Sequence, residues 1–152
     1  MNITPKQEAL FWAKVDKTGD CWIWTRSTAK GYGQICINKR VYKTHRVAYE
    51  LLVGPIPDGK VIDHTCYEPL CVNPDHLRPV TVAQNAENRS HGANSNSKSG
   101  IRGVHWDRRK HLWRVSVARH QGGYFHDIED ANRAAVALRN ELMTHNDADR
   151  VA

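Results

Sequence analysis

The stretch DHTCYEPLCVNPDHL, residues 63–77, contains two cysteines and two histidines within fifteen positions. Cys66, Cys71 and His76 follow the spacing C-x4-C-x4-H. Thiolates and imidazoles are ligands that zinc prefers, and a structural zinc site takes four of them in a tetrahedron. The sequence therefore predicts a zinc-binding loop whose fourth ligand comes from elsewhere in the chain.

The two remaining cysteines, Cys21 and Cys36, are the candidates for that fourth ligand. We favour Cys21, because it begins a predicted strand at residues 21–25 (CWIWT), where a thiolate can meet the loop without disturbing the packing face. Cys36 lies inside a second predicted strand, residues 32–37 (YGQICI), and we expect it to be a small buried apolar residue. Both remain open as the fourth ligand, and free buried cysteines are the alternative to a metal site.

The N-terminal twenty residues carry several charges and lack the apolar segment of a signal peptide. No run approaches the roughly 20 apolar residues of a membrane span. We therefore expect the chain in a reducing cytoplasm, that of a bacterium or of a phage-infected host. In that compartment four cysteines are more often metal ligands than disulfides.

The chain of 152 residues has a net charge of +6, which favours an anionic partner such as nucleic acid. A solvated basic surface is the alternative. Residues 89–100, RSHGANSNSKSG, have no bulky apolar side chain, and such a stretch cannot offset the entropy cost of ordering its backbone. We therefore predict two domains, residues 1–90 and 100–152, joined by a linker at 91–99.

Apolar periodicity and turn residues predict an α+β chain. In the first domain they predict helices at residues 5–15 and 82–90, with Thr81 as the N-cap of the second. Strands are predicted at 21–25 and 32–37, a strand that becomes a helix at 41–54, and a further strand at 59–65. The last strand, the metal-like loop and the helix at 82–90 form a predicted ββα unit.

His64 is not needed for the zinc site, and we expect it to point away from the neighbours of Cys66. A neutral imidazole with an ordinary pKa near 6.5 is suited to taking a proton from water. Asp63, beside it, and Asn85, on the following predicted helix, offer the oxygen ligands that magnesium accepts. A polar surface histidine is the plainer alternative.

The stretch from Asp63 to Asn88 resembles the HNH endonucleases, and among them the zinc-containing His-Cys box branch of the ββα-metal nucleases. The upstream segments CWIW, GYG and HRVAYE extend the resemblance over roughly residues 20–90. One departure is that His-Cys box enzymes often have a second zinc site, for which this chain has too few cysteines. The resemblance points to small mobile (homing) or phage-encoded enzymes.

The resemblance implies a role for each matching residue. His64 matches the general base, Asn73 the asparagine that braces the loop, and Cys66, Cys71 and His76 the zinc ligands. Asp63 and Asn85 match the ligands of a catalytic divalent metal, for which we expect Mg²⁺. Arg46 is a candidate for steadying the phosphate, or else a solvated helix residue.

Between Lys98 and Arg119 the chain has seven basic residues and one acid. Three strands, in GVHWD, LWRVSVARH and GGYFH, and a helix at residues 128–143 predict a small α+β unit. This part resembles the Apetala2-type DNA-binding domains, which lay a three-stranded sheet into the major groove with a helix behind it. The resemblance implies these DNA contacts: Trp106, Arg108, Trp113 and Arg114. Trp113 has a core role as its alternative. Arg109, also a predicted DNA-binding residue, is with Arg102 and Lys110 a weaker candidate for phosphate positioning.

Together these features predict a metal-dependent endonuclease for double-stranded DNA, with structural Zn²⁺, catalytic Mg²⁺ and a C-terminal module that supplies site preference. The competing hypothesis is a non-cleaving, zinc-stabilised DNA-binding regulator. RNA as substrate, nicking against double-strand cutting, and monomer against homodimer stay open.

Overall fold

A computed structural model of the protein describes residues 3–88 and 97–150, which form an α+β chain with small antiparallel sheets. The chain divides between Asn85 and Ala86 into two compact units. This division lies within the helix that precedes the predicted linker, and so comes before the predicted boundary at residue 90. Residues 91–96 of that linker lie outside the described residues, whereas residues 97–99 belong to the second unit.

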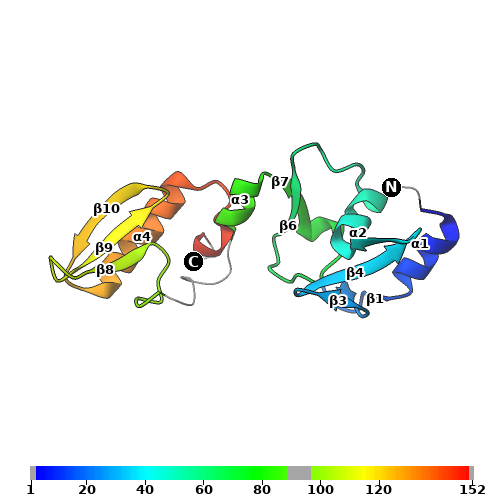
Figure 1. Cartoon of the computed structure of the whole chain (residues 1–152), viewed down its shortest axis with the longest axis horizontal. Helices are drawn as coiled ribbons and strands as arrows, with labels where there is room; N and C mark the ends of the chain where they lie inside the picture. Colours follow the sequence, from blue (N-terminus) through cyan, green and yellow to red (C-terminus); the bar gives the residue numbers. More distant parts are fainter. Residues whose placement is uncertain (1–2, 89–96, 151–152) are drawn as a thin grey trace. The chain divides into compact units, whose positions relative to one another are not determined.

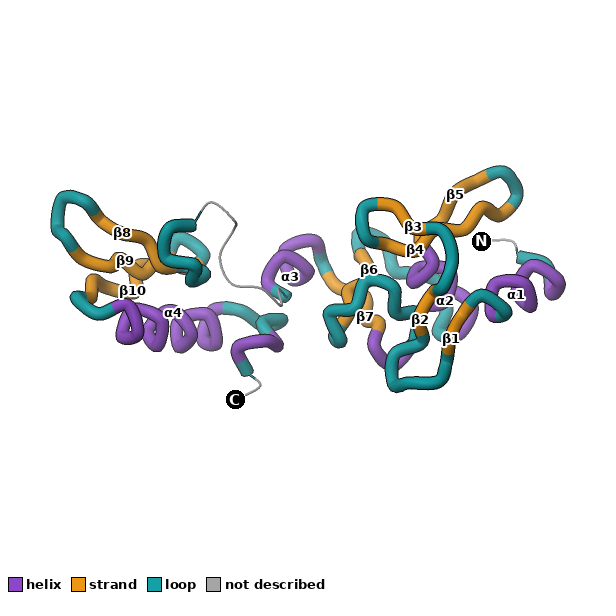
Figure 2. Tube along the Cα trace, turned by 90° about the horizontal axis from the view of Figure 1, so that it is seen from below, coloured by secondary structure: helices purple, strands orange, loops and turns teal. Residues whose placement is uncertain are grey.

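Figure 1 labels most helices and strands of both units, and Figure 2 also labels β2 and β5. The elements of the first unit are α1 (Pro5–Trp12), β1 (Val15–Asp16), β2 (Ile23–Trp24), β3 (Thr28–Ala29), β4 (Tyr32–Ile37), β5 (Arg40–Lys43), α2 (Thr44–Leu52), β6 (Val61–His64), η1 (Pro74–His76) and β7 (Leu77–Val80). Helix α3 (Val82–Glu87) begins in the first unit and ends in the second. The second unit contains β8 (Val104–Asp107), β9 (Leu112–Val117), β10 (His120–Phe125), α4 (Ile128–Leu142) and η2 (Asp147–Asp149).

Helix α1 starts at a capping box in which Thr4 and Gln7 bond each other's backbone. It ends at Trp12, earlier than the predicted residue 15, because Val15 pairs with Trp24 in the β1–β2 sheet. Phe11 of α1 is fully buried in a core cluster with Trp24 and with Val47 and Ala48 of α2. This cluster holds the N-terminal half of the unit together.

The predicted strand at residues 21–25 is shorter in the structure, where only Ile23 and Trp24 form β2. The backbone around β2 bonds to the metal-like loop instead. Trp24 N donates to Leu70 O, Val72 N donates to Trp22 O, and Ile23 forms an isolated bridge with Cys71. These bonds bring the segment that contains Cys21 against the loop.

Strands β4 and β5 form the predicted hairpin, with Asn38 and Lys39 at positive φ in its turn. Cys36 is exposed, so the prediction of a buried Cys36 is wrong. The reason is strand alternation: Ile37, its neighbour, points into the core, and Cys36 therefore points out. Helix α2 follows β5 directly and ends at Leu52, two residues before the predicted Gly54.

Strands β6 and β7 form an antiparallel hairpin that encloses the loop, and α3 follows (Figure 2). Strand β7 was not predicted, because Pro79 lies within it and proline is rare inside strands. Pro79 pairs with Ile62 at the end of a two-stranded sheet, where its missing N–H disrupts no third strand. Thr81 and Gln84 form a capping box at α3, with Thr81 as the predicted N-cap.

In the second unit, α4 packs against the sheet of order β10-β9-β8 (Figure 1). Its core contains Val104 and Val115 from the sheet and Ala131 and Ala135 from α4. Asp127 caps the helix by accepting from the backbone N–H of Glu129 and Asp130. No helix within residues 3–88 and 97–150 has the length and apolar composition of a membrane span.

Candidate active site and metal centre

The structure brings together the four side chains Cys21, Cys66, Cys71 and His76, whose ligand atoms all lie within 4.8 Å of one another. The Nδ1 atom of His76 lies 3.5 Å from Sγ of Cys21 and 3.5 Å from Sγ of Cys71. In a tetrahedral site, Zn–S bonds of about 2.3 Å and Zn–N bonds of about 2.0 Å place S and N roughly 3.5 Å apart. The donor set and its spacing therefore fit a Cys₃His zinc site, in which His76 would bind through Nδ1.

The other ring nitrogen of His76, Nε2, lies 3.3 Å from a carboxylate oxygen of Asp20. Metal-bound histidines commonly donate their second N–H to a carboxylate, which fixes the ring and raises its basicity. Asn73 ties the two segments together, because its Nδ2 donates to Asp20 O at 2.8 Å and its Oδ1 accepts from Asp75 N. Its backbone N–H also donates to Sγ of Cys71 at 3.4 Å. Asn73 thus makes bonds that brace the loop.

Two thiols of this cluster, those of Cys21 and Cys66, are difficult to ionise without a cation. Burial, together with hydrogen bonds and repulsion from Cys66 and Cys71, raises the pKa of Cys21 to about 12. Burial also raises the pKa of Cys66 above its ordinary value. Zinc binds thiolates and displaces their protons, so metal binding here would release protons and stabilise the fold.

His64 lies at the end of β6, opposite Leu77 of β7, and is buried. Its Nε2 lies 3.1 Å from the carbonyl oxygen of Cys71, so His64 faces the loop rather than pointing away from it as predicted. A carbonyl oxygen can only accept, so Nε2 carries the hydrogen and Nδ1 carries the lone pair in the neutral ring. Burial lowers the pKa of His64, partly opposed by the Cys71 bond and the charge of Asp63. The ring is therefore neutral at pH 7, with a basic Nδ1.

A second histidine, His45, lies beside His64 and was not predicted as a site residue. It is 3% exposed, and its ring centroid lies 4.7 Å from that of His64, at an interplanar angle of 72°. The signal for it is helical spacing, because His45 shares the buried face of α2 with Ala48 and Tyr49 at i+3 and i+4. A histidine at such a position is a polar group within the core, which the sequence interpretation overlooked.

Asp63 and Asn85, the predicted ligands of a catalytic metal, lie on β6 and α3. Strand alternation directs Asp63 to the opposite face of the hairpin from His64, where its Oδ2 accepts from Nε and Nη2 of Arg78, each at 3.0 Å. Asn85 is exposed on α3, and its side chain forms no hydrogen bond with the described residues. A magnesium site shared by the two residues stays a prediction. Arg46 is partly buried on α2, and its charge helps to lower the pKa of His45.

Residues 42–87 match the model of the HNH endonuclease family. This HNH segment runs from β5 to α3 and contains His45, His64 and three members of the Cys₃His cluster. Cys21 lies outside it, in the segment that β2 brings to the loop.

The relatives of the chain are phage proteins. It is 41% identical to protein 7.7 of Escherichia phage T7 over 69 residues, which are 45% of this chain and 53% of that protein. It is 41% identical to protein 2.8 of the same phage over 76 residues, 48% of this chain and 50% of that protein. The matched region thus spans about half the length of each of these relatives. No solved structure matches the chain significantly.

The predicted DNA-contacting residues outside the HNH segment lie on different faces of the second sheet. Trp113 packs against the core of the second unit, which was the alternative to its predicted role as a DNA contact. Trp106 pairs with it across β8 and β9, on the same face of the sheet. The open face carries Arg114, which pairs with His105 and Tyr124 in register. Arg109 lies in the turn between β8 and β9.

Arg102 does not suit the phosphate-positioning role predicted for it. Its Nη1 donates to the backbone oxygen of Glu87 at 2.8 Å, and its Nη2 approaches Ala86 O and the sulfur of Met143. These bonds satisfy backbone groups inside the second unit. Arg102 is therefore an anchor of the fold.

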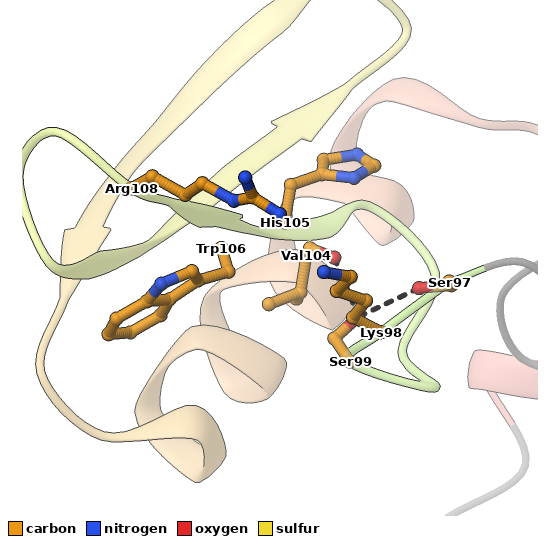
Figure 3. Close-up of a pocket in the computed structure, with 7 residues that line it drawn as sticks. All are labelled: Ser97, Lys98, Ser99, Val104, His105, Trp106 and Arg108. Carbon is orange, nitrogen blue, oxygen red and sulfur yellow. Dashed lines mark hydrogen bonds between the residues drawn. The ribbon is translucent and has the colours of Figure 1, made fainter.

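Trp106 and Arg108 line a groove of about 280 Å³ along the edge strand β8. Figure 3 shows His105 and Arg108 on one side of the β8 ribbon and Trp106 and Val104 on the other, with Lys98 beside them. A second groove, at the β8–β9 end, is lined by Trp106, Asp107, Arg108, Arg109 and Arg114. The only acid in these two grooves, Asp107, accepts hydrogen bonds from the backbone N–H of Arg109 and Lys110. The edge of β8 is therefore a basic surface around a partly exposed indole.

Proposed function

We propose that the protein is a metal-dependent DNA endonuclease in which His64 is the general base. The match of residues 42–87 to the HNH endonuclease family indicates nuclease activity. The observation that carries the proposal is the bond from His64 Nε2 to the carbonyl oxygen of Cys71, because it leaves Nδ1 as the basic nitrogen. Cys71 is also a member of the Cys₃His cluster, so the same residue orients the base and would bind the zinc.

The reaction is hydrolysis of a phosphodiester bond. Nδ1 of His64 takes a proton from a water molecule, whose oxygen attacks the phosphorus in line as the bond to the 3′ oxygen breaks. The leaving 3′ oxygen ends as a hydroxyl after it takes up a proton. HNH nucleases use divalent metals, and such an ion supplies charge stabilisation to the phosphorus centre and the leaving oxygen.

Assignment of that ion to Asp63 and Asn85 rests on the resemblance to HNH enzymes. In the structure Asp63 accepts from Arg78 and Asn85 is exposed on α3. The assignment, and Mg²⁺ as the ion, stay predictions. Arg46 as a phosphate contact is likewise a prediction.

We propose that the second unit binds DNA through the basic edge of β8. Lys98, Arg108 and Arg114 supply positive charge near Trp106, whose side chain is 41% exposed. Such surfaces bind the phosphate backbone through charge and contact bases through aromatic rings. This differs from the expectation of a whole sheet face in the groove, because the two tryptophans lie on the face that α4 covers.

The rival hypothesis is a zinc-stabilised protein that binds DNA without cutting it. The observation that favours it is the ion pair of Asp63 with Arg78, because a carboxylate held by a guanidinium is less available to a catalytic metal. The same experiment distinguishes the two hypotheses.

The test is a nicking assay on supercoiled plasmid with Mg²⁺, comparing wild type, His64→Ala and His126→Ala. We expect His64→Ala to lose on the order of 10²–10⁴ in rate, which is the usual contribution of a general base. His126 lies in an exposed loop after β10, so His126→Ala serves as the matched control and should cut at the wild-type rate. Zinc content, folding and DNA affinity should be similar in all three proteins. Equal cutting by wild type and His64→Ala would exclude the proposed base, and a wild type that binds but never cuts would support the rival.

A further inference from the structure

His45 of the HNH segment has a buried polar atom without a hydrogen-bond partner. The side chain is 3% exposed, and its Nδ1 is buried without any hydrogen bond to the described residues. More than nine in ten buried polar groups in proteins have a partner, and an exception commonly marks a bound water or ion. Nδ1 of His45 is therefore a buried polar atom for which the described residues supply no partner, as expected of a site for a bound water.

The surroundings of His45 place its imidazole ring beside the proposed base. The centroid of its ring lies 4.7 Å from that of His64, and the two rings meet nearly edge-on. The centroid of the Tyr32 ring lies 5.5 Å from that of His45. Burial lowers the pKa of His45 to about 3, and the charges of His64, Lys43 and Arg46 act in the same direction. The imidazole is therefore neutral and has one N–H group and one lone pair to offer.

The burial of His45 limits the size of the ligand that Nδ1 can hold. A side chain that is 3% exposed cannot meet a nucleotide directly, whereas a water molecule needs only one probe-sized space and two or more polar partners. The imidazole of His64, the nearest titratable ring, is the second polar group at this place. A water that bonds to both rings would lie next to Nδ1 of His64, the nitrogen that takes a proton from water in the proposed reaction.

We propose that His45 is a positioning residue for the general base, and that its Nδ1 holds a water molecule against the His64 imidazole. This inference rests on the proposed endonuclease function. The His45 ring also limits rotation of His64, because its edge packs against the His64 ring from the rigid helix α2.

Thr44, the neighbour of His45, provides a matched control. It is fully buried and its Oγ1 also lacks a hydrogen-bond partner. Its hydroxyl, however, lies under β4, since a methyl group at Gly33 would be only 2.3 Å from Oγ1. Thr44→Val removes this hydroxyl and keeps the shape of the side chain. It therefore tests whether the loss of any buried, unpartnered polar atom at the start of α2 affects cleavage.

The experiment measures kcat and KM for plasmid cleavage by the full chain as wild type, His45→Phe, His45→Asn and Thr44→Val. Phenylalanine keeps the ring contact but removes both nitrogens, whereas asparagine places a polar atom close to the position of Nδ1 and loses the ring. We expect His45→Phe to lose about 10²-fold in kcat with little change in KM, as for a misplaced reacting group. His45→Asn should keep a larger share of kcat than His45→Phe, and Thr44→Val should match wild type. Zinc content, thermal unfolding and DNA affinity of each variant identify any loss of folding.

The order of the two His45 variants decides the proposal. A His45→Phe variant as fast as wild type, or faster than a folded His45→Asn, would show that only packing matters and would overturn the water-holding role. A Thr44→Val variant as slow as His45→Phe would overturn it as well, because the effect would then be general to the start of α2. A wild-type protein that does not cut overturns the endonuclease proposal itself, and this role with it.

Discussion

At the scale of single residues, one carbonyl oxygen determines the chemistry available to His64. Because Cys71 O can only accept, the proton of the neutral imidazole lies on Nε2 and the basic lone pair on Nδ1. A neighbouring histidine, His45, supplies a second neutral ring. Burial lowers the pKa of both rings, so neither carries a charge near pH 7.

The lowered pKa of His45 predicts how stability depends on pH. Its pKa of about 3 in the folded state lies below the ordinary 6.5, so below pH 6.5 the unfolded chain binds the proton more readily than the folded chain. This histidine therefore has no effect on stability above pH 6.5 and destabilises the fold progressively as pH falls from 6.5 towards 3. Each such group contributes a slope of about 1.4 kcal/mol per pH unit.

We therefore expect the unfolding free energy of wild type to fall more steeply than that of His45→Phe between pH 6.5 and 5, measured by urea denaturation. The comparison between the two proteins removes the acid sensitivity of the zinc site, which both share. Parallel pH profiles for the two proteins would contradict a strongly lowered pKa of His45.

At the scale of elements, the loop between β6 and β7 depends on bonds to a segment far away in sequence. Trp24 N bonds Leu70 O, Val72 N bonds Trp22 O, and Asn73 Nδ2 bonds the backbone of Asp20. These bonds hold Cys21 beside Cys66, Cys71 and His76, and a zinc ion would join both segments covalently. A small unit with short strands gains much of its stability from such a metal.

Metal analysis tests this directly. We expect about one zinc per chain, and a chelator that removes it should lower the unfolding temperature and broaden the transition. Cys66→Ser should lose both zinc and cooperative folding, and Cys21→Ser should lose nearly as much. Cys36→Ser is the matched control, since Cys36 is an exposed cysteine on β4, and it should keep zinc and stability. Freshly purified protein without zinc, or a Cys36→Ser variant that alone loses it, would contradict the Cys₃His assignment.

At the scale of the whole molecule, the two compact units have different tasks in the proposed function. The first contains the base and the Cys₃His cluster, and the second contains the basic edge of β8. The second unit includes the end of α3, because Glu87 accepts hydrogen bonds from the backbone of Thr144 and His145. A fragment meant to fold as this unit should therefore include α3 and begin at residue 82, not at the end of the predicted linker.

The prediction at this scale concerns DNA affinity. The fragment of residues 82–152 should bind DNA without cutting it, and its affinity should fall steeply with salt because lysines and arginines displace condensed counterions. In that fragment Arg108→Ala should weaken binding and reduce the salt slope by about 1. Arg133→Ala removes an equal charge on exposed α4, where Arg133 pairs with Asp130, and should change little. Both would be measured by fluorescence anisotropy over a salt series, and equal effects of the two variants would exclude the β8 edge as the contact surface.

The sequence by itself determined those features whose causes are local. The spacing of Cys66, Cys71 and His76 places three ligands on one short loop, and this spacing was sufficient to predict a metal site. Alternating and helical apolar patterns predicted β4, α2 and α4 with small errors at their ends, because burial of one face follows directly from periodicity. The Thr81 cap of α3 was also predicted, since a capping box involves only residues three apart.

The tertiary structure decided the features that depend on contacts between distant residues. Cys21, and not Cys36, lies in the Cys₃His cluster because Ile23 pairs with Cys71 and brings the neighbouring Cys21 to the loop. The strand β7 exists despite Pro79 because β6 pairs with it, and Arg78 of that strand is the partner that holds Asp63. His45 became a site residue because folding packs α2 against the end of β6. No local sequence pattern predicts these contacts. The hydrogen bonds, ion pairs and ring contacts involved form between residues that only the fold brings within a few ångströms of each other.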